Sequence, residues 1–348
     1  MLLELKQSPM ARDGLRRAGE EIVELLAQLA AGRSPAEALS LLPAGHRPKA
    51  KAVEAIAALP VEERRALRDA VEADLAFDVD FDEPSFEFAF PTLSDATKEA
   101  GKGLLTSMYK DVFCRGGGFK VGSTIITRSS WEQSFRDANP RIKVCPACLS
   151  ARLPRPARGR SLVDADHYLP KSKYPALAVH GLNLVLVCKD CNESLKGDLD
   201  PLFNDGEINR LGDVWFPYRR AGLGELILEI AVDARQQTVN LGGTPPALER
   251  AQRFDRLFAL LERWSETLEN VAERLPPSLR AAEAQLNEPA IRREIEKFQR
   301  IAEEEITEDE RAFIKSHYYR WLLTTPGAFQ TLLDEMQAQS EERAAQAP

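Results

Sequence analysis

Two cysteine pairs enclose the stretch of sequence that decides the fold. The first pair is Cys145-Pro-Ala-Cys148, the second is Cys188-Lys-Asp-Cys191, and 39 residues separate them. Over residues 163–197 the chain reads VDADHYLPKSKYPALAVHGLNLVLVCKDCNESLKG. Four thiolates fill the tetrahedral coordination of a structural Zn²⁺ ion. The alternative, a redox-active pair, needs a thioredoxin-like pattern around one pair, which this sequence lacks. We therefore expect all four cysteines to hold structural zinc.

The residues in and after this interval predict two strands and a helix. Residues 160–166 are typical of a short strand that Pro170 ends, and residues 183–187 of a second, strongly apolar strand. Residues 190–197 predict a helix that stops at Gly197. The polar side chains that this order places near the strand ends and on the helix are Asp166, His167, Asn183 and Asn192.

These side chains suit the hydrolysis of a phosphodiester. The carboxylate of Asp166 and the amide oxygen of Asn192 are hard ligands for Mg²⁺ or Mn²⁺. His167 belongs to the residue type that titrates near neutrality, so it can take a proton from an attacking water. Asn183 can fix the loop that carries His167 and thereby orient the imidazole. Asp164, two residues before Asp166, either faces the core or assists the metal.

Basic residues gather around the candidate site. Residues 115–160 hold ten Lys and Arg against two acids, which fits a phosphate backbone and, equally well, a solvated basic surface. Lys196 follows Asn192 by four residues, so the two share a helix face. The residues expected to contact nucleic acid are Lys171, Lys173, Lys196, Arg152, Arg155, Arg158 and Arg160.

On the motifs CPAC, DHYLPKSKYP and NLVLVCKDCNESLKG, residues 145–197 resemble the HNH nucleases, which have the ββα-metal fold. The resemblance implies a catalytic metal on Asp166 and Asn192, with zinc on the cysteine pairs. His167 would be the general base and Asn183 an organiser of the site. It also implies an endonuclease that leaves 5′-phosphate and 3′-hydroxyl ends. One departure is an extra residue, Leu195, before the Lys-Gly that closes the motif.

The whole chain is expected to be mainly α within an α+β class, with the nuclease module embedded between helical regions. We expect a helical region with an acidic, Phe-rich linker over 1–93, the nuclease module with its basic segment and zinc site over 94–222, and a β-hairpin followed by helices over 223–348. The helices are predicted from apolar residues that recur at helical spacing.

Bulk composition bounds the function further. The 348 residues carry a net charge of −8, which argues against indiscriminate nucleic-acid binding. No apolar run is long enough to cross a membrane. We therefore expect a cytoplasmic protein, and in the cytoplasm paired cysteines hold metal more often than they form disulfides. DNA is the expected partner, with a regulatory protein or a second copy restraining the activity, as in a bacterial restriction or anti-phage effector. A zinc-stabilised, non-catalytic nucleic-acid-binding module is the alternative, and a structural interaction protein ranks third.

Overall fold

A computed structural model describes residues 1–79, 81, 83, 86–115, 117–121, 123–158, 160–204, 207–208, 210–233, 236–282 and 287–346. Helices dominate this part of the chain, as composition and periodicity predict. The residues divide into two compact units, a first unit of 1–140 and 154–224 and a second unit of 141–153 and 225–348. Asp80, Asp82, Pro84 and Ser85 of the acidic, Phe-rich linker lie outside the described residues.

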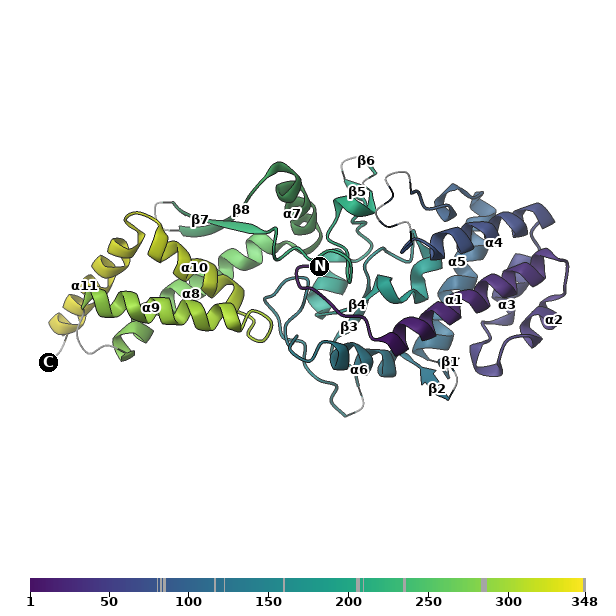
Figure 1. Cartoon of the computed structure of the whole chain (residues 1–348), viewed down its shortest axis with the longest axis horizontal. Helices are drawn as coiled ribbons and strands as arrows, with labels where there is room; N and C mark the ends of the chain where they lie inside the picture. Colours follow the sequence, from purple (N-terminus) through teal and green to yellow (C-terminus); the bar gives the residue numbers. More distant parts are fainter. Residues whose placement is uncertain are drawn as a thin grey trace. The chain divides into compact units, whose positions relative to one another are not determined.

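The first unit begins with a helical bundle and continues into short strands and helices (Figure 1). Its longer helices are α1 (Pro9–Ala30), α2 (Pro35–Ser40), α3 (Ala50–Ala57), α4 (Val61–Leu75), α5 (Asp95–Ser107) and α6 (Arg128–Ala138). Its short or wide-turn helices are η1 (Ala44–His46), η2 (Phe90–Thr92), η3 (Met108–Cys114), η4 (Pro175–Val179), η5 (Gly181–Asn183), η6 (Asp190–Lys196) and η7 (Leu211–Asp213).

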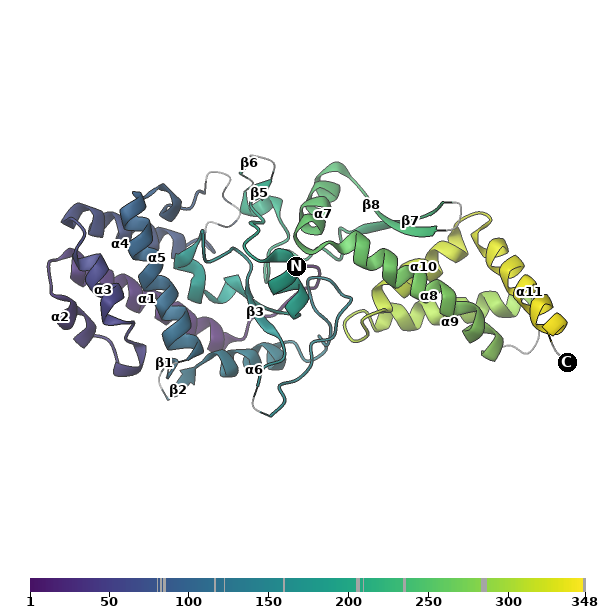
Figure 2. The ribbon, with the colours of Figure 1, turned by 180° about the vertical axis from the view of Figure 1, so that it is seen from behind.

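Helix boundaries in the bundle follow local chemistry. The hydroxyl of Ser34 accepts a hydrogen bond from the Glu37 backbone, the Glu37 side chain bonds back to Ser34, and Pro35 occupies the first position of α2, which is a capping box. Gly32, just past the end of α1, has a φ of +89°, a conformation that glycine adopts without strain. Helix α1 then packs its apolar face on α4, as both views of the ribbon show (Figures 1 and 2).

Every sheet within the described residues is a two-stranded antiparallel pair. The pairs are β1 (Phe119–Val121) with β2 (Thr124–Ile126), β3 (Asp164–His167) with β4 (Leu184–Val187), β5 (Phe203–Asn204) with β6 (Glu207–Ile208), and β7 (Ile227–Asp233) with β8 (Gln236–Gly242). Strand β3 begins later than the predicted residue 160. The carbonyl of Val163 is occupied by the side chains of Arg128 and Ser161, so the ladder starts only at Asp164.

The second unit packs helices against the β7–β8 hairpin, which confirms the β-hairpin expected at the start of residues 223–348. Its helices are α7 (Pro245–Phe258), α8 (Leu260–Ala282), α9 (Glu288–Glu304), α10 (Ala312–Thr324) and α11 (Ala328–Gln346). Helices α7 and α8 are separated at Ala259, which adopts a left-handed conformation with φ +45°.

Helix α8 then continues through two prolines where the sequence predicts a break. Pro276 and Pro277 each remove a backbone donor. Leu275 and Leu279, one turn apart, are both buried. Their burial on one face offsets the two missing backbone bonds, so packing overrides local propensity here.

Candidate active site

The polar residues of the predicted site lie on strand β3 and helix η6 of the first unit. In the β3–β4 ladder Asp164 pairs with Val187, Asp166 with Val185 and His167 with Leu184. Side chains alternate along a strand, so Asp164 and Asp166 share one face and His167 points to the other. Both predicted strands and the helix exist in the expected order, and the helix ends at Gly197, whose φ is +47°.

Two side-chain bridges connect the face of β3 that bears the acids with η6. The amide nitrogen of Asn192 donates to Oδ2 of Asp164 at 3.1 Å. The ammonium of Lys196 donates to Oδ1 of Asp166 at 3.0 Å and to the carbonyl of His167 at 2.7 Å. Asn192 thus lies beside Asp164, whereas the sequence had assigned it to a metal shared with Asp166.

Asp166 is held in an unusually demanding environment. Its side chain is 2% exposed and that of Lys196 is 0% exposed. Burial raises the pKa of the Asp166 carboxyl, and the Lys196 ammonium acts in the opposite direction. The second carboxylate oxygen, Oδ2, is buried without a hydrogen-bond partner. A buried carboxylate oxygen with no donor is the kind of atom that a bound ion explains.

His167 is buried on the other face of β3, and its ring is oriented by the backbone. Nε2 lies 2.9 Å from the carbonyl of Ala178. Because a carbonyl only accepts, Nε2 carries the proton and Nδ1 keeps its lone pair. Burial, and next the nearby Lys171, lower the pKa of His167 to about 3. The pKa of this buried imidazole therefore lies below the near-neutral range expected from the residue type, and the ring is neutral at pH 7, with its lone pair on Nδ1.

Asn183 fastens the loop that holds His167 in place. Its amide oxygen accepts from the backbone of Leu169 at 2.7 Å, and its amide nitrogen donates to the carbonyls of Leu169 and Leu177 at 3.0 Å and 3.2 Å. Leu177 precedes Ala178, whose carbonyl orients His167. Asn183 itself is fully buried. Its side chain therefore joins the segment after β3 to the segment before β4.

Helix η3 contributes a residue that the sequence did not reveal. The ring of Tyr109 meets the ring of His167 edge-on at 4.4 Å between centroids. The ammonium of Lys171 lies 5.9 Å from the Tyr109 centroid. Burial raises the pKa of Tyr109, which stays protonated. No motif marks Tyr109, because its contact with His167 joins segments almost sixty residues apart.

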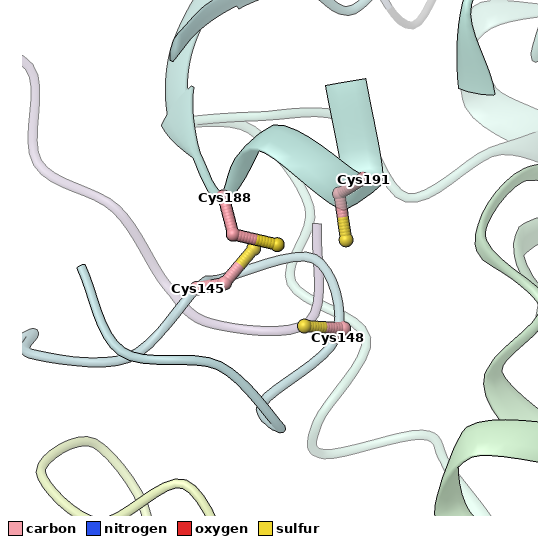
Figure 3. Close-up of side chains that lie close together, drawn as sticks. All are labelled: Cys145, Cys148, Cys188 and Cys191. Carbon is pink, nitrogen blue, oxygen red and sulfur yellow. The ribbon is translucent and has the colours of Figure 1, made fainter. Parts of the chain in front are cut away.

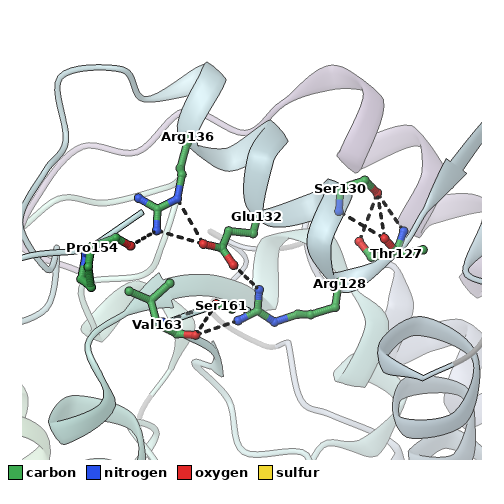
Figure 4. Close-up of polar contacts among 8 residues, drawn as sticks. All are labelled: Thr127, Arg128, Ser130, Glu132, Arg136, Pro154, Ser161 and Val163. Atoms are coloured by element: carbon green, nitrogen blue, oxygen red, sulfur yellow. Dashed lines mark hydrogen bonds and ion pairs between the residues drawn. The ribbon is translucent and has the colours of Figure 1, made fainter. Parts of the chain in front are cut away.

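Helix α6 anchors the start of β3 through a buried ionic network (Figure 4). The carboxylate of Glu132, 2% exposed, accepts from Arg136 at 2.9 Å and from Arg128 at 3.3 Å. Arg128 also donates to the carbonyl of Val163 at 3.1 Å, and Arg136 to that of Pro154 at 2.7 Å. These bonds fix the backbone immediately before Asp164.

Ion pairs also neutralise part of the basic segment, residues 115–160. Besides Arg128 and Arg136, Lys143 pairs with Glu308, and Arg152 with Glu310 at 2.7 Å. Lys143 and Arg152 are thus paired with acids outside residues 115–160, whereas Glu132 is one of the two acids already counted within that segment.

The candidate phosphate contacts differ in how accessible they are. Arg155, Arg158 and Arg160 are exposed beside the Ala157–Arg160 bridge. Lys171 is half-buried next to Tyr109, and Lys173 lies 3.4 Å from Asp200. Lys196 is buried in its bond to Asp166, so it offers no exposed surface to a phosphate in this conformation.

The four cysteines of the two pairs form one buried cluster (Figure 3). Their sulfur atoms all lie within 4.8 Å of one another, and no disulfide joins them. In a tetrahedral ZnS₄ site with bonds of about 2.3 Å the sulfurs are about 3.8 Å apart, so the cluster could hold a metal such as zinc. Cys148 is further fixed by the Trp264 indole, which donates to its carbonyl at 2.8 Å, and by Arg263, which approaches its sulfur at 3.4 Å.

No protein-family model, curated protein or solved structure matches this chain. None of the helices described is both long enough and apolar enough to cross a membrane.

Proposed function

We propose that this protein is a metal-dependent endonuclease that hydrolyses phosphodiester bonds of nucleic acid, with DNA as its substrate. The observation that carries the proposal is the state of His167. Its Nε2–H donates to the Ala178 carbonyl at 2.9 Å, which fixes the tautomer and leaves the lone pair of Nδ1 free to accept a proton. His167 is the last residue of β3. Successive residues can share a site where a strand ends and twists, so a base at this position, directly after Asp166, supports a ββα-metal site.

In the proposed mechanism Nδ1 of His167 accepts the proton of the attacking water. The Ala178 carbonyl stabilises the imidazolium that results, and Asn183 keeps that carbonyl in position. The Tyr109 ring limits the rotation of the imidazole. The protein therefore supplies an oriented base whose tautomer does not depend on the substrate.

A divalent cation such as Mg²⁺ or Mn²⁺ would offset the charge that develops on the phosphate and on the leaving 3′-oxygen. The residues present fit such a cation, because Asp166 has a buried oxygen without a donor and Asn192 offers a neutral oxygen on the same side of β3. Binding of the nucleic-acid backbone is assigned to Lys171 and to the exposed Arg155, Arg158 and Arg160.

Cleavage of supercoiled plasmid and of structured RNA tests the proposal. Wild type and His167→Ala are compared in Mg²⁺, in Mn²⁺ and in EDTA. The matched control is Asp190→Asn, an exposed acid on η6. We expect metal-dependent cutting by wild type and the control, and a loss of at least about 100-fold in His167→Ala. If wild type binds both substrates and cuts neither, a non-catalytic binding module replaces the enzyme.

An effector role in host defence follows from the same proposal. It predicts that overexpression arrests bacterial growth and that His167→Ala relieves the arrest. If an enzyme that is active in vitro is harmless when overexpressed, the effector role is contradicted and the nuclease activity stands.

A further inference from the structure

We propose that Asp164 is a third ligand of the divalent cation, together with Asn192 and the free oxygen of Asp166. Lys196, on this proposal, is a fixed internal cation that keeps metal binding weak until a phosphodiester is present. The inference rests on the proposed function for its substrate, but the metal site can be tested without it.

A hydrogen bond holds the side chains of Asp164 and Asn192 together, at a separation that two ligands of one small cation also have. The amide nitrogen of Asn192 and Oδ2 of Asp164 lie 3.1 Å apart. Neighbouring oxygens in octahedral Mg²⁺ coordination, with bonds of about 2.1 Å, are about 3.0 Å apart. The side chains therefore already hold a distance that suits coordination of one ion.

The amide of Asn192 can serve both the metal-free and the metal-bound states. Without a cation, two facing oxygens would repel, so the amide turns its nitrogen to the Asp164 carboxylate. A half-turn of the amide exchanges its oxygen and nitrogen in nearly the same space. Both atoms of the pair then present oxygen to an ion between them.

An independent sign of a missing ligand is the second oxygen of Asp166. Asp164 and Asp166 stand two residues apart on β3 and therefore share one face of the strand. Oδ1 of Asp166 is taken by Lys196, whereas Oδ2 is buried and has no hydrogen-bond partner. A cation on this face would satisfy that oxygen together with Asp164 and Asn192.

The charges on this face explain why binding should be weak. Lys196 offsets the charge of Asp166 within a buried ion pair, so Asp164 supplies the remaining negative charge of the set. Mg²⁺ in such sites commonly relies on one or two carboxylates plus a substrate phosphate. The phosphodiester would thus complete both the ligands and the charge balance.

Mn²⁺ binding, followed by the electron paramagnetic resonance signal of the free ion, tests the site directly. The full-length, zinc-loaded protein is used, so that the cysteine cluster is the same in each variant. The variants are Asp164→Asn, which keeps an oxygen for the Asn192 amide, and the exposed control Asp190→Asn. Loss of outer-shell partners already weakens metal binding 10–100-fold. We therefore expect at least about a tenfold higher dissociation constant for Asp164→Asn and less than a twofold change for the control.

Adding a 3′-phosphorothioate-blocked oligonucleotide duplex should tighten Mn²⁺ binding to wild type at least about fivefold. Thermal melting identifies a variant that fails to fold, in which case Asp164→Ser replaces Asp164→Asn. Equal Mn²⁺ affinity in wild type and the folded Asp164 variant overturns the inference, and so does a wild type that binds no Mn²⁺ at millimolar concentration.

These results separate the inference from the proposed function. If Asp164 is needed for Mn²⁺ binding but wild type cuts neither DNA nor RNA, the metal site stands and the nuclease fails. If wild type cuts through His167 but Asp164→Asn binds Mn²⁺ normally, the nuclease stands and Asp164 only hydrogen-bonds Asn192.

Discussion

Replacing Lys196 by Met should be among the most destabilising single changes in the first unit. The side chains of Lys196 and Asp166 are 0% and 2% exposed, and the ammonium also donates to the His167 carbonyl at 2.7 Å. Met keeps the volume but leaves the buried carboxylate without a donor on either oxygen. Breaking a buried ion pair from one side costs about 3–5 kcal/mol, and we expect Lys196→Met to lower the free energy of unfolding by that amount.

A double-mutant cycle in urea separates this cause from lost packing. Asp166→Asn removes the charge that Lys196→Met strands, so the double variant should recover at least about 2 kcal/mol relative to the sum of the singles. Far-UV circular dichroism follows unfolding, and if the units unfold separately only one transition should shift. Asp190→Asn, the exposed control, should stay within about 0.5 kcal/mol of wild type. If Lys196→Met lowers the free energy of unfolding by less than about 1 kcal/mol, and the effects of the two single variants simply add, Lys196 and Asp166 do not form a buried ion pair.

Three further changes test other parts of the structure. Cys145→Ser should abolish the expected single zinc per chain, measured by inductively coupled plasma mass spectrometry, whereas Cys114→Ser should retain it. Zinc retained by both variants would contradict its assignment to the four-cysteine cluster. Asn183→Ala should lower the free energy of unfolding by at least about 3 kcal/mol, because three buried backbone groups lose their partner, and a melting temperature like that of wild type would contradict this. Burial raises the pKa of Asp74 to about 7. Between about pH 4 and pH 7 the folded state therefore keeps a proton on Asp74 that the unfolded state has lost, and the free energy of unfolding falls by about 2 kcal/mol from pH 5 to pH 7. Asp74→Asn should flatten this dependence of unfolding free energy on pH. An unchanged dependence would assign it to other groups.

The cysteine cluster and the local element order were accessible from the sequence. Two Cys-x-x-Cys pairs predict one site of four sulfurs, and the four cysteines do lie together. A continuous apolar run likewise predicted strand β4, and a terminal glycine predicted the end of η6. These features depend on chemistry within a few residues, which a sequence displays directly.

The pairing of side chains across the site was not accessible in the same way. A spacing of four residues predicts that Lys196 shares a helix face with Asn192. It does not predict whether the ammonium reaches solvent or Asp166. That outcome depends on how deeply η6 packs against β3, and the same packing turns Asn192 to Asp164. Alternation along β3 does put both acids on one side, so this part of the signal was present.

Charge counting along the chain was similarly limited. Residues 115–160 look strongly basic in sequence, yet Arg128 and Arg136 share the buried Glu132, and Lys143 pairs with Glu308. Only the fold shows which acids approach which bases. The exposed arginines that remain are concentrated near the Ala157–Arg160 bridge.

The central claim is that a neutral, oriented His167 hydrolyses phosphodiester bonds. Its most direct test is the single-turnover rate at which wild type and His167→Ala nick supercoiled plasmid in Mg²⁺, followed by sealing of the nicks with DNA ligase. We predict nicking that falls at least about 100-fold in His167→Ala, with wild-type nicks that ligase seals directly because they carry 5′-phosphate and 3′-hydroxyl ends. Equal nicking by the two proteins, or no nicking of any nucleic acid by wild type, would contradict the claim.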